Sequence, residues 1–203
     1  MDAWLAYWPD VVVGFVFLAG LLMLVADDWR WLLWYLAVVY AGAAALISLV
    51  WPWTLAATLL VGGWMAASVL GLSQQRVVTD NGGGRLSERV LRLLAGVLAA
   101  LLALAIAPGM ALWLPKMGES YLWGSLALMV LGLWQVGLRS NRPLWVVAGL
   151  LTILAGFSML YAVLEQALLL AGLMALVVVM LALAGGYLVL QQESEIQDEE
   201  MAL

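Results

Sequence analysis

Few side chains in this chain of 203 residues have the chemistry for acid–base, nucleophilic or metal-binding work. The absence of Cys and His excludes disulfides, thiolate nucleophiles, imidazole proton relays and the usual zinc and haem ligands. No cofactor is therefore expected. The remaining candidates are isolated polar residues in long apolar stretches, namely Gln135, Ser158 and Glu165. Polar groups in such stretches mark either interhelical hydrogen bonds or functional sites.

Gln135 and Ser158 are predicted to make interhelical or backbone hydrogen bonds rather than to bind a substrate. Glu165 is the stronger functional candidate. With Gln166 it forms the only adjacent polar pair in the apolar run 144–190, which is too long to be one membrane-crossing helix. We expect a helical hairpin with Glu165 at its tip. There the carboxylate is solvated or, inside an assembly, pairs with a partner's cation or lies in an ion path.

The ionisable residues do not form a catalytic constellation. No predicted span carries two of them three or four residues apart, as paired-acid catalysis would need. The single Lys, Lys116, lies in a predicted loop, so a retinal Schiff base in the last span is excluded. A membrane enzyme therefore ranks last among the possible functions, because only Glu119, Tyr161 or Glu165 could serve as its base or nucleophile. We assign no catalytic, cofactor-binding or metal-binding residue.

The composition places the chain in a membrane. It is 67% apolar and 10% charged, whereas soluble domains are about 45–50% apolar and about 25% charged. The mean hydropathy is +1.07. The sequence thus predicts an all-α polytopic membrane protein.

Spans of about 20 apolar residues cross the hydrocarbon core, and the sequence predicts seven transmembrane helices. They form one domain over residues 1–190, followed by an acidic tail at 191–203. The predicted spans are 11–26, 31–50, 54–72, 90–107, 122–138, 144–164 and 167–190.

The positive charges predict the orientation. With seven spans, all cations except Lys116 fall on one side of the membrane, and Lys and Arg favour the cytoplasmic side. We therefore expect an outside N-terminus and a cytoplasmic C-terminus in a bacterial cytoplasmic (inner) membrane. Five arginines on this side are predicted to contact lipid headgroups or a partner: Arg76, Arg85, Arg89, Arg139 and Arg142.

Charge also bears on partners other than the lipid bilayer. The net charge is −5 and much of it lies between Glu193 and Glu200, so no nucleic-acid surface is expected. This acidic tail is either a solvated extension or a docking segment for a basic cytoplasmic partner. Within the spans, Gly63, Ala67 and Gly71 form one small-residue stripe, which predicts close helix packing and contact with other membrane subunits.

One family resemblance is confined to the C-terminal third. The segment RPLWVVAGLLTILAGFSMLYA, residues 142–162, resembles a second span of the K-type subunit of respiratory complex I. It also resembles the related C-type subunit of multisubunit sodium/proton antiporters. The last span, with Ala171-Gly172-Leu173, is similar to the third span of such subunits.

The resemblance implies a packing position beside large antiporter-like subunits. Those small subunits carry membrane-embedded glutamates for proton transfer. Here Ser158 stands at the place of the first, and the last span offers only apolar residues for the second. The proton-relay function is therefore not expected to carry over.

Two functional hypotheses follow. The first is a non-catalytic integral membrane subunit or accessory protein of a larger bacterial complex that translocates ions or transfers electrons. The alternative is an autonomous transporter or channel for a small neutral or hydrophobic solute. Such proteins often contain interrupted helices, for which Gly62-Gly63, Pro108-Gly109 and Gly185-Gly186 are the nearest candidates.

Overall fold

The computed structural model describes the backbone of residues 2–75, 86–113, 118–164 and 168–201, which is helical apart from short connectors and turns. Its helices are α1 (Asp2–Val25), α2 (Trp29–Ile47), α3 (Trp53–Gln74), α4 (Leu86–Ala111), α5 (Glu119–Leu138), α6 (Pro143–Leu164) and α7 (Leu168–Met201). All seven are long and apolar enough to cross a membrane. The predicted all-α architecture with seven candidate spans is thereby confirmed.

Residues with suitable capping or backbone chemistry stand at the starts of three helices. Asp28 caps α2, since its Oδ1 accepts a hydrogen bond of 3.0 Å from the backbone N–H of Arg30. Pro52 precedes α3 and Pro143 opens α6, at positions where a missing N–H costs little. Beyond these starts the apolar sequence favours a continuous helix, because a backbone in lipid must satisfy its own hydrogen bonds.

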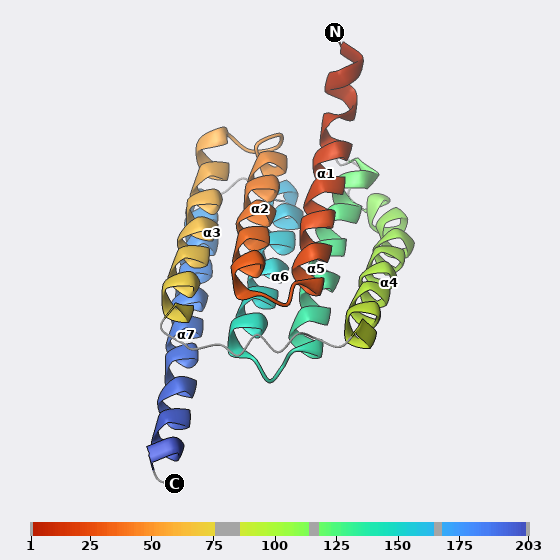
Figure 1. Ribbon diagram of the computed structural model, residues 1–203. Coiled ribbons are helices and arrows are strands. Elements are labelled where there is room, and N and C mark those ends of the chain that lie inside the picture. Colours follow the sequence, from red (N-terminus) through yellow and green to blue (C-terminus); the bar gives the residue numbers. More distant parts are fainter. Residues whose placement is uncertain (1, 76–85, 114–117, 165–167, 202–203) are drawn as a thin grey trace.

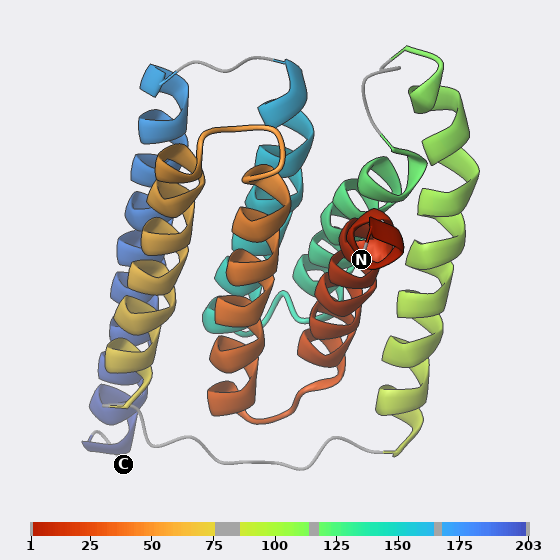
Figure 2. The same cartoon turned by 90° about the horizontal axis from the view of Figure 1, so that it is seen from above.

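The helices form two layers, with α4 beside them. Figures 1 and 2 show α1, α2 and α3 in one layer and α5, α6 and α7 in the other, so that α1 lies against α5, α2 against α6 and α3 against α7. Helix α4 packs on α5 and, less extensively, on α1. Because the seven helices alternate in direction, the N- and C-terminal ends lie at opposite ends of the bundle (Figure 1).

The closest helix contact, between α5 and α6, depends on glycine. A Cβ at Gly149 would lie 2.9 Å from the carbonyl oxygen of Gly132, and one at Gly132 would lie 2.6 Å from that of Gly149. A Cβ at Gly156 would likewise meet the carbonyl oxygen of Ser125 at 2.6 Å. Small residues at these positions let the two backbones approach one another.

The predicted stripe of α3 faces α2. Gly63 lies against the ring of Tyr40, and a Cβ at Gly71 would contact Leu33 at 3.4 Å. Ala67 packs against the same core. An adjacent side of α3 meets α7, where Gly62 approaches Ala175.

The largest extensions beyond the predicted spans are those of α1 and α7. Helix α1 begins at Asp2 rather than near residue 11, and α7 continues through the acidic segment to Met201. Helix α6 ends at Leu164 and α7 begins at Leu168, and Glu165, the predicted tip of the hairpin, lies outside the described residues.

Candidate functional site

Charged side chains from three parts of the chain meet at one end of the bundle. The carboxylate of Asp27 contacts Nε of Arg89 at 2.7 Å, Nη1 of Arg92 at 2.7 Å and Nη2 of Arg139 at 3.0 Å. Arg92 also reaches Glu88 at 3.1 Å. We call Asp27, Glu88, Arg89, Arg92 and Arg139 the arginine–aspartate cluster.

The fold brings these residues together from separate elements. Asp27 lies in the short connector between α1 and α2. Arg89 and Arg92 lie on one face near the start of α4, three residues apart, and Arg139 is the C-cap of α5. The cluster therefore ties α4 and α5 to the α1–α2 connector.

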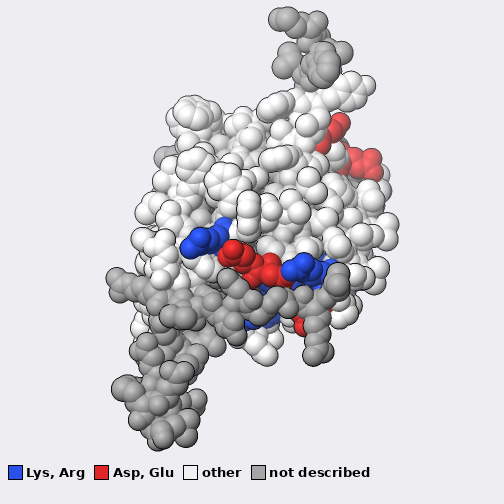
Figure 3. All heavy atoms as spheres, viewed as in Figure 1, with Lys and Arg blue, Asp and Glu red and all other residues white. Residues whose placement is uncertain are grey.

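The space-filling view shows how unevenly charge is distributed. On the face in Figure 3, blue and red spheres gather in one band toward the C-terminal end. The rest of the described surface on this face is white, apart from red atoms toward the N-terminal end.

Arg139 is the most enclosed member of the cluster. Its side chain is 7% exposed, and the guanidinium carbon lies 3.6 Å from the centre of the Trp145 ring. Burial, together with the neighbouring charge of Arg92, lowers the pKa of Arg139 to about 10, although Asp27 opposes this. Arg139 thus stays charged at neutral pH, and its Nη1 is buried without a hydrogen-bond partner among the described residues.

For Asp27, the neighbouring arginines affect the pKa more strongly than burial does. Burial on its own would raise the pKa of this carboxyl, but the hydrogen bonds from Arg92 and Arg89 outweigh it and hold the pKa below its ordinary value. Asp27 is therefore ionised at neutral pH and offsets part of the arginine charge.

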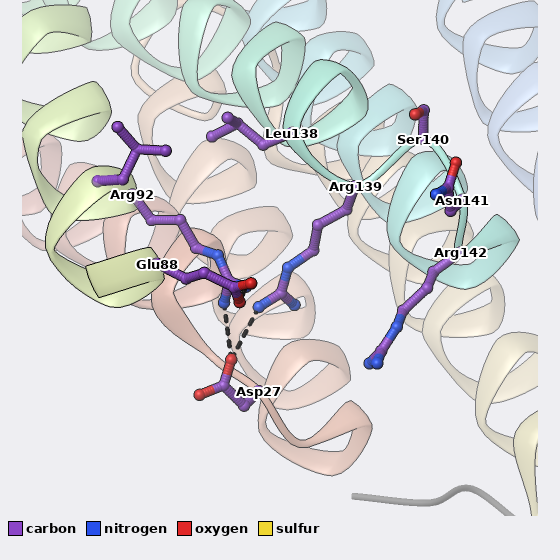
Figure 4. A pocket seen from close by; sticks show the side chains of 9 residues that line it. Asp27, Glu88, Arg92, Leu138, Arg139, Ser140, Asn141 and Arg142 are labelled. Atoms are coloured by element: carbon purple, nitrogen blue, oxygen red, sulfur yellow. Dashed lines mark hydrogen bonds and ion pairs between the residues drawn. The ribbon is translucent and has the colours of Figure 1, made fainter. Parts of the chain in front are cut away.

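A hollow of about 420 Å³ lies beside the cluster, lined by Asp27, Glu88, Leu91, Arg92, Leu138, Arg139, Ser140, Asn141 and Arg142. Figure 4 shows the guanidinium groups of Arg139 and Arg142 extending toward the same space from either side of the turn between α5 and α6. Arg142 makes no side-chain hydrogen bond or ion pair with the described residues, so its charge is available to another group.

The predicted lipid- or partner-facing arginines have different environments. Arg89 and Arg139 are paired with Asp27, and Arg142 lines the hollow. Arg76 and Arg85 lie outside the described residues. Asp27 was not among the predicted site residues, although an acid in a connector on the arginine-rich side was a signal that could have found it.

The two polar candidates within spans bond to backbone. Gln135 donates from Nε2 to the carbonyl oxygen of Trp145 at 3.3 Å, and Ser158 donates to that of Leu154 at 2.7 Å. The structure thus places Gln135 in a link between α5 and α6 and Ser158 in a bond within α6.

The concentration of charged groups around the hollow suits the site to electrostatic binding. Within the part of the chain that the structure describes, no group of three or more acidic residues could hold a metal ion. Comparisons with protein families, curated proteins and solved structures find no match to this chain.

Proposed function

We propose that this protein is a non-catalytic integral membrane subunit or accessory protein of a larger membrane assembly that translocates ions or transfers electrons. The observation that carries the proposal is the use of polar side chains within the spans. The hydrogen bonds that these described side chains make lead to a neighbouring helix or back to their own helix.

Three such ties involve α6 or its start. The hydroxyl of Tyr40 on α2 donates to the carbonyl oxygen of Leu151 at 2.9 Å, and that of Tyr121 on α5 donates to Met159 at 2.9 Å. Gln135 makes the third. A membrane enzyme or transporter needs polar groups that are free to meet a substrate, whereas these groups stabilise a fixed bundle.

Tryptophans add further ties at the flanks of the bundle. Trp64 of α3 donates to the carbonyl oxygen of Ala37 at 3.2 Å, and Trp123 of α5 donates to that of Ala100 at 3.3 Å. The alternative function, transport of a small neutral solute, would use Trp64 or Gln135 at a binding site. Their bonds to neighbouring helices favour the structural role.

The outer surface supports assembly with other membrane proteins. Helix α4 has few neighbours, and large apolar side chains cover its exposed sides: Val90, Leu91, Leu93, Leu94, Val97, Leu98, Leu101, Leu102, Leu104 and Ile106. Such a surface suits lipid or the apolar face of another subunit. The resemblance of residues 142–162 to small subunits of ion-translocating complexes favours antiporter-like partners.

The proposal includes an orientation. All described arginines lie near the helix ends at one side of the bundle, the side of the arginine–aspartate cluster and of the C-terminal end. The positive-inside tendency assigns this side to the cytoplasm. We therefore propose an outside N-terminus, a cytoplasmic C-terminus and residence in a bacterial cytoplasmic membrane.

Purification from native membranes tests the assembly role. The protein, tagged and expressed at its natural level, is solubilised in a mild detergent, sized, and analysed by mass spectrometry for co-purifying chains. We expect a particle larger than the detergent-bound monomer, with other membrane subunits in fixed ratio. A monomer without stable partners in several mild detergents would contradict the proposal.

A further inference from the structure

We propose that the hollow beside the arginine–aspartate cluster binds a phosphate group, carried by an anionic phospholipid or present as free phosphate. This inference concerns a binding site and does not depend on the assembly role.

Positive charge exceeds negative charge around the hollow. Arg92, Arg139 and Arg142 line it against two carboxylates, those of Asp27 and Glu88. A fourth guanidinium, that of Arg89, pairs with Asp27 and so lies close to the hollow. Four positive groups against two negative ones leave two positive charges without a counter-charge among the described residues.

Two arginines at the hollow have guanidinium donors without acceptors among the described residues. Arg139 uses Nη2 on Asp27, but its Nη1 is buried without a partner in the described part of the chain. Arg142 has no side-chain partner there either, and Figure 4 shows it directed toward the same space. A buried guanidinium nitrogen without an acceptor is costly, and a phosphate oxygen would satisfy it with a charge-assisted bond.

The guanidinium groups that line the hollow repel one another. The charges of Arg92 and Arg142 contribute, after burial, to the lowered pKa of Arg139. An anion seated among the three guanidinium groups would relieve this repulsion. Arginine suits the task because its planar fork matches phosphate oxygens.

The size, lining and position of the hollow also suit a phosphate group. Its volume of about 420 Å³ lies at the small end of the range for ligand pockets. Ser140 and Asn141 add polar groups on one side, and the partly exposed Leu91 and Leu138 add apolar surface. It lies where α4 begins and α5 ends, which is the depth of phospholipid headgroups if these helices span the bilayer.

Thermal unfolding of the purified protein in a neutral detergent tests the proposal. The additions are phosphatidylglycerol, phosphatidylcholine, inorganic phosphate, and chloride at the same ionic strength. A ligand that binds only the folded state raises the Tm. We expect phosphatidylglycerol to raise the Tm more than phosphatidylcholine does. An equivalent selective effect of phosphate over chloride would identify free phosphate as a source.

Two variants and one control locate the effect. Arg142→Gln should at least halve the selective Tm shift, because it removes a free guanidinium from the hollow. Asn141→Asp places a carboxylate there, and should raise the Tm without ligand while reducing the shift. Arg30→Gln is the control, since Arg30 lies at the same end but does not line the hollow.

The Tm shifts of the native protein and the three variants distinguish a site in the hollow from binding elsewhere. A selective shift that Arg142→Gln and Asn141→Asp reduce and Arg30→Gln preserves would support the site, whether lipid or phosphate causes it. Absence of a selective shift in the native protein would overturn the proposal. A shift that is equal in all four proteins would also overturn it, because the anion would then bind elsewhere.

Discussion

At the residue scale, Asp27 has more partners than any other described charged side chain. Its two oxygens accept hydrogen bonds from three arginines on two helices, and Arg139, the most buried of these, depends on it for its ion pair. Taking one member from a buried charge group costs more than the group contributes when intact, because the other charge stays buried without a partner. Asp27 is thus the residue on which this end of the bundle depends.

Replacing Asp27 should therefore destabilise the fold. We expect Asp27→Asn to lower the free energy of unfolding by about 3 kcal/mol, the low end for a broken buried pair, because Asp27 is 21% exposed. Glu88→Gln is the matched control. Glu88 is 55% exposed and pairs with Arg92 alone, so its loss should cost at most about 1 kcal/mol. Thermal unfolding followed by tryptophan fluorescence measures both, and equal effects would refute the role of Asp27.

The same residue predicts a pH dependence. The pKa of Asp27 is lower in the folded protein than its ordinary value of 3.8, so its stabilising contribution is fully present above that ordinary value. The contribution is lost as the pH falls through the folded pKa. The difference in Tm between the native protein and Asp27→Asn should be constant from pH 7 to about pH 5 and shrink below about pH 4. A difference that grows on acidification would contradict this sign.

At the element scale, the bundle is held by close helix packing. The tightest contact, of α5 with α6, places the backbone at Gly132 and Gly149 too close for side chains. The sequence indicated small-residue packing but emphasised Gly63, Ala67 and Gly71 on α3. The pairing of Gly132 with Gly149 was not predicted, because helical spacing shows which residues share a face and not which helix that face meets.

Alanine substitutions test this contact. A Cβ at Gly149 would press on the backbone of Gly132 and on Val136, so the helices must separate. We expect Gly149→Ala to lower stability by about 1–3 kcal/mol, as overpacking does. Gly137→Ala, on α5 with open space around its Cβ, should be neutral or slightly stabilising. The Tm of each variant is compared with that of the native protein. An unchanged Tm for Gly149→Ala would contradict the close approach of the two backbones.

At the scale of the whole molecule, the hydropathy pattern was enough to predict the seven candidate spans, because length and apolar content alone define them. The arginine–aspartate cluster was harder to predict. Arg89 and Arg139 were identified as arginines at one end, but their shared counter-ion, Asp27, is 62 and 112 residues away in the sequence. Only the arrangement of α1, α4 and α5 brings them together.

Orientation is testable on the whole molecule because the chain has no native Cys. Single cysteines at Asn141 and at Trp113 lie at opposite ends of the bundle. In intact cells, we expect a membrane-impermeant maleimide to label Trp113→Cys from outside and to leave Asn141→Cys unlabelled until the membrane is opened. The reverse pattern would refute the proposed topology.

The proposed structural role requires that the interior of the bundle is dry and serves packing rather than passage. Single cysteines at Ala66, Ala127, Ala148 and Ala155, all buried, test it most directly. We expect none of them to react with a water-soluble maleimide in the folded protein, and all of them to react after unfolding in detergent. Reaction of these positions in the folded protein would reveal a hydrated path through the bundle and contradict the claim.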